Sequence, residues 1–222
     1  MRLTTDDVNT HIVLPHTFHA VRVMNDRLSP VVFNIEVALI SSRISGKTAE
    51  ESGEMAGLGF RKIKTWLEMV LHEIIIINTA SNLIDILSDE TENLIMTTPS
   101  EPDDAILAAL LLTKMQTIVR DLLIIDSITL VSSDTGYMKR IMKNEDIHLP
   151  GIEYLGIEAA HKEPWWLRET IETADFPRTD ETDEYFAEFA TRDPLKDLER
   201  DMLHNEEADV ISIDAWKTDK PH

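Results

Sequence analysis

Residues 31–40 read VVFNIEVALI, and this stretch decides the fold. Every second residue is large and apolar, which is the repeat of a β-strand that buries one face. The buried face is expected to hold Val31, Phe33, Ile35, Val37 and Leu39. The alternate positions are mixed in polarity, so helices are expected to cover the sheet on one side.

A second strand is expected immediately before this one. Residues 16–24 alternate imperfectly between polar and apolar, and residues 25–30, NDRLSP, are rich in turn formers. The two segments therefore predict an N-terminal β-hairpin whose turn spans residues 25–30.

Two main helices are predicted after the hairpin. Thr48 is suited to cap the first helix, with Glu50 and Glu51 in its first turn. Apolar residues then recur three and four apart along one helix face, at Phe60, Ile63, Leu67, Val70, Ile74 and Ile77. A second helix is expected over about 104–121, capped by Ser100 or Asp103 and with Pro102 in its first turn. Its apolar face holds Leu107, Leu111, Met115, Ile118 and Leu122, with Lys114 beside them.

A further strand over 123–132 gives the order β-β-α-α-β, which predicts an α+β fold. We place a core domain in 1–135, an irregular connection with a short basic helix in 136–168, and an acidic, partly helical extension in 169–222. Residues 209–216 alternate enough to form a strand added to a sheet edge.

Composition restricts the function. The 222 residues carry a formal charge of −20, which disfavours nucleic acid and anionic membranes as partners and suits basic protein surfaces. Two local basic clusters, at residues 61–64 and 139–143, could receive the acidic extension of the same or another copy. Cysteine is absent, so disulfides and zinc–thiolate sites are excluded. With no export signal or bilayer-length apolar run, we expect a cytoplasmic protein.

Residues 41–48, SSRISGKT, imitate the end of a P-loop, and residues 122–126, LLIID, imitate a Walker B strand. Ser41 stands where the first glycine of a P-loop would permit the tight turn. A strand-to-helix turn capped by Thr48 explains the same residues, and a nucleotide site remains the lesser alternative.

Two other clusters could bind metal. The histidines His11, His16 and His19 are close in sequence, but on a strand His16 and His19 point to opposite faces. Five aspartates could form a magnesium site if the fold gathered them, namely Asp103, Asp104, Asp121, Asp126 and Asp134. Each also has a simpler role at a helix cap, strand end or turn. We expect no cofactor and no catalytic residue.

The acidic extension is the strongest functional signal. Residues 169–207 hold fourteen carboxylates and four basic side chains, yet large apolar residues recur among them. Such a segment is expected to dock on a protein surface while staying soluble beforehand. The predicted partner-binding residues are Trp165, Trp166, Tyr185, Phe186, Phe189, Leu195, Leu198, Met202 and Trp216.

These observations favour a non-enzymatic interaction or assembly subunit, either a homo-oligomer or part of a larger complex. Viral structural or accessory proteins are one setting for acidic, cysteine-free chains without familiar motifs, and for a viral protein we expect the virion as its location. The alternative is an acidic mimic of nucleic acid that inhibits a basic protein.

Overall fold

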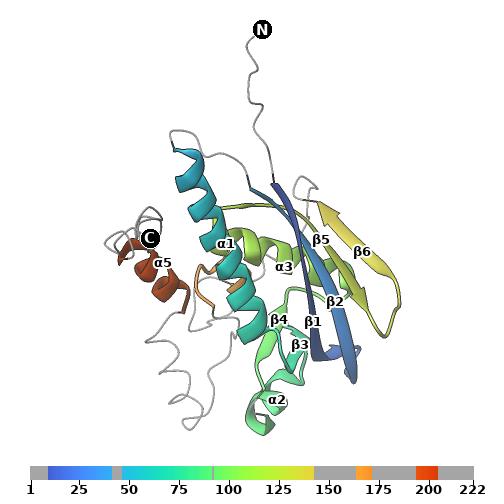
Figure 1. Cartoon of the computed structure of the whole chain (residues 1–222). Coiled ribbons are helices and arrows are strands. Elements are labelled where there is room, and N and C mark those ends of the chain that lie inside the picture. Colours follow the sequence, from blue (N-terminus) through green and yellow to red (C-terminus); the bar gives the residue numbers. More distant parts are fainter. Residues whose placement is uncertain (1–9, 42–46, 92, 143–163, 172–193, 205–222) are drawn as a thin grey trace, which may run out of the picture.

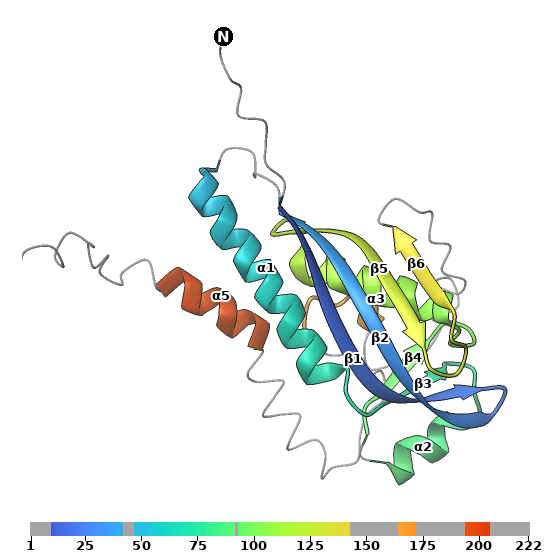
Figure 2. The ribbon, with the colours of Figure 1, turned by 45° about the vertical axis from the view of Figure 1, so that its right-hand side comes forward.

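The computed structural model of the chain describes residues 10–41, 47–91, 93–142, 164–171 and 194–204. Six strands form one sheet in the order β4-β3-β1-β2-β5-β6. Helices α1 and α3 lie against one side of this sheet, and α2 lies at one end of it (Figures 1 and 2). The strands are β1 (Thr10–Met24), β2 (Arg27–Ser41), β3 (Ile74–Asn78), β4 (Ile95–Thr98), β5 (Ile124–Ser132) and β6 (Met138–Met142). The helices are α1 (Ala49–Val70), α2 (Ile84–Glu90), α3 (Asp104–Val119), the short 3-10 helix η2 (Trp165–Leu167) and α5 (Pro194–His204). The predicted α+β class, the N-terminal hairpin and both main helices are confirmed.

The hairpin is longer and its turn tighter than predicted. Only Asn25 and Asp26 lie outside the two strands, and both have positive φ angles, 49° and 57°. This is the geometry of a two-residue hairpin turn that matches the twist of the flanking strands. Pro30 lies within β2 opposite Val21. The pairing of β2 with β5 begins only at Phe33, so the N–H group that proline lacks is not needed for a hydrogen bond to β5.

The alternation in β2 is confirmed. The five predicted residues are all buried, and β2 pairs antiparallel with both β1 and β5. The pairing with β5 slips once, since Ala38 lies opposite Ser127 and Leu39 opposite Ile125, which leaves Asp126 as the extra residue of a bulge. A bulge shifts the side-chain alternation by one residue. The apolar side chain that β5 buries before the bulge is therefore at an odd position, Ile125, and those it buries after the bulge are at even positions, Ile128 and Leu130.

Helix α1 begins as predicted but ends earlier. Thr48 accepts the Glu51 N–H, and the Glu51 carboxylate accepts the Thr48 N–H, forming a capping box. The prediction that the helical face continues to Ile77 was wrong: α1 ends at Val70, and residues 74–77 lie in β3. Glu73, with a φ of 52°, lies in the connection between them.

Strand β3 is buried on both faces, which explains its unbroken run of four isoleucines. It lies parallel to β1 and to β4. One face joins the main core, and the other forms a small second cluster with Val23, Ile84 and Ile95. Helix α2 supplies Ile84 and so closes this second face.

Strands β4 and β6 were not predicted. The short basic helix expected after residue 136 was wrong, because Met138–Met142 pair antiparallel with β5. A strand at the edge of a sheet is solvated along one side, so its charged residues resemble those of an exposed helix.

Helix α3 is the central helix of the structure. Asp103 caps it by accepting the Ile106 N–H at 2.7 Å, as predicted, while Pro102 precedes the cap instead of lying in the first turn. Ten of its sixteen residues are buried, on more than one face. Leu122, predicted on its apolar face, lies beyond its C-terminal end. Within the described residues, no helix is long and apolar enough to cross a membrane.

The main core extends into the C-terminal half of the chain. Ile141, Trp165, Trp166 and Leu195 belong to the same buried cluster as the residues of α1, α3 and the sheet. Residues from the predicted segments 136–168 and 169–222 thus complete the core of 1–135.

A buried arginine joins three parts of this fold. The Arg22 guanidinium, on β1, is 1% exposed and pairs with Asp104 at 2.6 Å and with Asp134. It also donates to the Pro102 carbonyl oxygen at 3.2 Å, and it lies 5.1 Å from the centre of the Phe33 ring. The network therefore fixes the start of α3 and the turn after β5 against β1.

Candidate docking surfaces

The two adjacent tryptophans lie inside the chain's own core. Trp165 and Trp166 are both fully buried, and their rings meet edge to face with centroids 5.6 Å apart. Adjacent residues on a regular strand point to opposite faces, and both indoles enter one core here because they lie on the short 3-10 helix η2. As partner-binding residues they would have to leave this core, so the folded chain presents neither of them to another protein.

Lys114 holds this segment in place. Its ammonium group donates to the carbonyl oxygens of Trp165 (2.8 Å), Arg168 (2.7 Å) and Thr170 (2.7 Å). The Trp165 indole N–H in turn donates to the Thr97 carbonyl oxygen of β4 at 2.8 Å. Residues 164–171, called the tryptophan segment below, are thus bound to α3 and β4 by charge-assisted and neutral hydrogen bonds.

Helix α5, within the acidic extension, packs against α1 of the same chain. Leu195 is buried, and Leu198 and Met202 are half-buried. Lys62 on α1 forms an ion pair with Glu199 on α5. The partly helical character predicted for the extension is therefore confirmed over Pro194–His204. Lys62, in the predicted basic cluster 61–64, does pair with an acidic residue of the extension within the same chain.

The other predicted partner-binding residues are not in the described part of the chain. Tyr185, Phe186, Phe189 and Trp216 lie outside the described residues, so their roles stay predictions. The proposed edge strand over 209–216 lies outside them as well.

The two edges of the sheet differ sharply. All four residues of β4 are buried, and the Thr97 carbonyl oxygen already accepts the Trp165 indole. At the opposite edge, no described strand pairs with the outer side of β6. Met138 is 70% exposed, and Tyr137, just before the strand, is 79% exposed. An exposed edge with large apolar side chains is a template for another strand.

Positive charge is concentrated on this same edge. Lys139 and Arg140 are adjacent and exposed on β6, in a chain whose net charge is −20. They lie on opposite faces of the strand because side chains alternate. An incoming strand with carboxylates would therefore meet a cation on either face.

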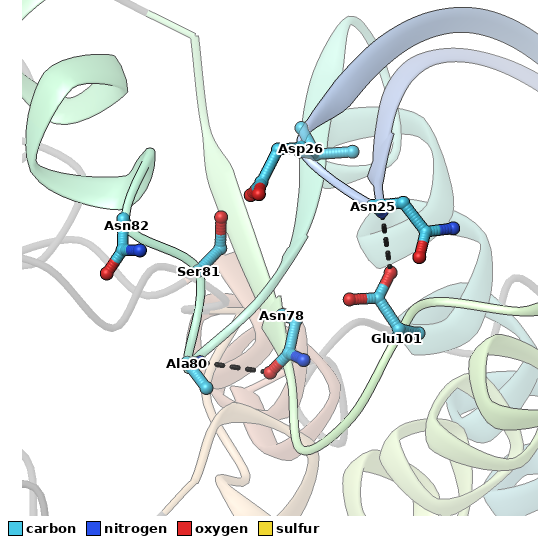
Figure 3. A pocket seen from close by; sticks show the side chains of 8 residues that line it. Asn25, Asp26, Asn78, Ala80, Ser81, Asn82 and Glu101 are labelled. Carbon is cyan, nitrogen blue, oxygen red and sulfur yellow. Dashed lines mark hydrogen bonds between the residues drawn. The ribbon is translucent and has the colours of Figure 1, made fainter.

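A small polar cleft lies at the carboxyl ends of β1 and β3 (Figure 3). Its volume is about 280 Å³, and it is lined by Val23, Asn25, Asp26, Asn78, Ala80, Ser81, Asn82 and Glu101. Its polar groups close local turns: Glu101 accepts the Asn25 N–H at 3.2 Å, and Asn78 accepts the Ala80 N–H at 2.9 Å. We assign no ligand to it.

The P-loop-like residues occupy a different architecture from a nucleotide site. The Thr48 hydroxyl, which would bind magnesium in a P-loop, accepts the Glu51 N–H in the capping box. Lys47 is exposed, and its ammonium group lies 3.9 Å from the Glu51 carboxylate. Residues 42–46 lie outside the described residues. The strand before the motif, β2, runs antiparallel to β5, which carries Asp126, whereas doubly wound nucleotide folds have parallel strands.

The candidate metal ligands are dispersed. His11 and His19 are exposed on the open face of β1, while His16 faces the core side and is half-buried. Burial outweighs its hydrogen bond with the Leu71 backbone, so the pKa of His16 is lowered. Of the five aspartates, Asp104 and Asp134 do meet, but with Arg22 between them. No group of three or more potential ligands forms within the ranges the structure describes.

The burial of two cations, Arg22 and Lys114, was not predicted. Each had a signal: Arg22 follows Phe18 and Ala20 on the core-facing side of β1, and Lys114 lies among the apolar residues of α3. A charged residue at a core position implies a partner that satisfies it.

Comparison with known proteins adds little to these observations. No protein-family model matches the chain, and no curated protein is similar to it in sequence. Among solved structures, the chain is similar to the crystal structure of an uncharacterized protein, WS1659, from Wolinella succinogenes. The identity is 12%, the TM-score is 0.41, and the match covers 62% of this chain and 98% of that one.

Proposed function

We propose that this chain is a non-enzymatic interaction or assembly subunit that docks through its acidic C-terminal extension. The observation that carries the proposal is the contact between α5 and α1. There an acidic helix binds through a buried leucine and an acidic residue paired with a lysine. This contact supports the proposal, because one helix of the extension lies on a surface that supplies both apolar contacts and a lysine.

The rest of the extension has the same composition. Residues 205–222 hold acidic residues together with Val210, Ile211, Ile213 and Trp216. The β6 edge offers what such a segment needs, namely exposed apolar side chains beside Lys139 and Arg140. The positive charge of Lys139 and Arg140 repels a basic strand and gives no advantage to a neutral one. This edge therefore favours pairing with an acidic strand.

Deletion of residues 205–222 tests the proposal and keeps every described residue of the core. The cut falls after α5, so Leu195 and the Lys62–Glu199 ion pair remain. We expect the shortened chain to keep its unfolding free energy within about 1 kcal/mol and to lose its association, because the apolar anchors supply binding energy. The measurement is mass in solution by sedimentation over about 1–100 µM.

A matched variant distinguishes the contribution of the apolar side chains from that of the carboxylates. Replacing Val210, Ile211, Ile213 and Trp216 by serine keeps the length and every carboxylate. It is expected to behave like the deletion. If both variants associate as the intact chain does, and with unchanged affinity for any partner, the extension is not a docking element.

A further inference from the structure

His16, on β1, lies beside the C-terminal end of α1, where its ring is hydrogen-bonded to the Leu71 backbone. We propose that His16 is a pH-sensitive switch whose protonation opens the connection between α1 and β3. The side chain is half-buried on the core side of the sheet, and its Nε2 atom is buried with no hydrogen-bond partner among the described residues. A proton on that atom would bring a positive charge and an N–H group to a place without an acceptor, which is unfavourable in a buried position.

The surroundings of His16 favour its neutral form. Burial is the largest influence and lowers the pKa of His16 from its ordinary 6.5. The chain at the end of α1 brings two titratable groups, of which the Glu68 carboxylate favours the charged ring and the His72 ring opposes it. Both side chains are more than half exposed, so water screens them more than it screens the buried nitrogen. On the sheet, the neighbours of His16 on the same face are apolar, namely Leu14, Phe18 and Ile35.

The connection from α1 to β3 is a short turn that includes an unfavourable backbone conformation. Leu71 has a φ of −85° and a ψ of 65°, and the His72 N–H donates to the Val70 carbonyl oxygen at 3.0 Å, which is an inverse γ-turn. Glu73 follows with a φ of 52°, a region that residues other than glycine rarely adopt. Such a connection opens at lower cost than the buried strand after it, so a protonated ring beside it has a local way to reach water.

The direction of the pH dependence follows from the lowered pKa. The folded chain favours the neutral ring, so the contribution of His16 to local stability is fully present above about pH 6.5. That contribution is lost as the pH falls from this value through the folded-state pKa. Glu68→Gln removes a charge that favours the protonated ring and should enlarge the loss. His72→Gln removes a charge that opposes the protonated ring and should reduce the loss.

Amide hydrogen exchange in the full chain tests the switch. After correction for the intrinsic exchange rates, we expect the protection of the Leu71 and His72 amides to fall severalfold between about pH 7 and about pH 5, while the amides of α3 keep theirs. His16→Gln does not titrate in this range, so its protection at the same amides should not change with pH. His19→Gln, on the exposed face of the same strand, is the control and keeps the response of the wild type.

A titration of the His16 ring by NMR in the wild type adds a measurement that needs no variant. A ring that titrates at or above pH 6.5 overturns the switch. Protection that is the same at both pH values, or that falls in His16→Gln as it does in the wild type, overturns it as well. If His16→Gln already lowers the protection at neutral pH, the neighbouring variants decide: opposite changes in Glu68→Gln and His72→Gln support the switch, and equal changes contradict it.

Discussion

Replacement of Lys114 by methionine is expected to lower the free energy of unfolding by about 3–5 kcal/mol. Methionine fills similar space, but it cannot donate to the three carbonyl oxygens that the ammonium group now satisfies. A buried acceptor that loses its donor costs about 1–3 kcal/mol. Those carbonyls belong to the tryptophan segment, so we also expect Trp165 and Trp166 to become exposed. Urea unfolding and the wavelength of tryptophan emission measure the two effects.

Lys64→Met is the matched control for this variant. Lys64 lies on α1 with its side chain 53% exposed, and it lies 3.7 Å from the Glu68 carboxylate on the same helix. Its loss is expected to cost less than about 0.5 kcal/mol. A Lys114→Met variant as stable as this control, with unchanged tryptophan emission, would contradict the role we assign to the buried ammonium group.

Replacement of Arg22 by methionine is expected to lower the unfolding free energy by about 3 kcal/mol. The change leaves the Asp104 carboxylate, 12% exposed, without its counter-charge and leaves the Pro102 carbonyl without its donor. Arg27→Met, at the exposed start of β2, is the control. Adding Asp104→Asn to Arg22→Met should recover part of the loss, because the unpaired carboxylate is then removed. Strictly additive effects of the two substitutions would show that the residues do not interact.

The same network predicts a sensitivity to acid. Burial opposes ionisation of Asp104, but hydrogen bonds from Ser132, Thr135 and Arg22 and the Arg22 charge outweigh it, so the pKa of Asp104 lies below its ordinary 3.8. A carboxyl whose pKa is lowered by folding adds stability that is fully present above about pH 3.8 and is lost as the pH falls through the folded-state pKa. The stability difference between the wild type and Asp104→Asn should therefore shrink in that range. A difference that stays constant down to about pH 2 would contradict this assignment.

The sequence predicted those elements whose signals are local. The strict alternation of residues 31–40 and the caps Thr48 and Asp103 depend on neighbours within a few positions. They needed no knowledge of the rest of the fold.

The missed elements depend on distant parts of the chain. Residues 74–77 continue the helical spacing of α1, and no glycine or proline marks the change; the four isoleucines form a strand because β1, β4 and α2 bury them. Strand β6 exists because β5 offers it an edge. Arg22 and Lys114 find partners about 50 to 110 residues away, so the spacing that places them at core positions does not identify the groups that they bind.

The composition of the acidic extension predicts docking, but it does not predict which protein surface the extension contacts. Leu195 proved to be an anchor on the chain's own body, whereas Trp165 and Trp166 proved to be core residues. The pattern of apolar residues among carboxylates predicts a segment that binds a protein surface. It does not identify whose surface, because that depends on how far each part of the segment can reach.

Amide hydrogen exchange in β6 tests the central claim most directly. The intact chain and the chain without residues 205–222 are compared at a concentration where the intact chain associates. If β6 accepts a strand, every second amide of residues 138–142, those facing away from β5, should exchange about 10-fold or more slowly in the intact chain. Equal exchange rates at those amides in the two chains would contradict the claim that the acidic extension docks on this edge.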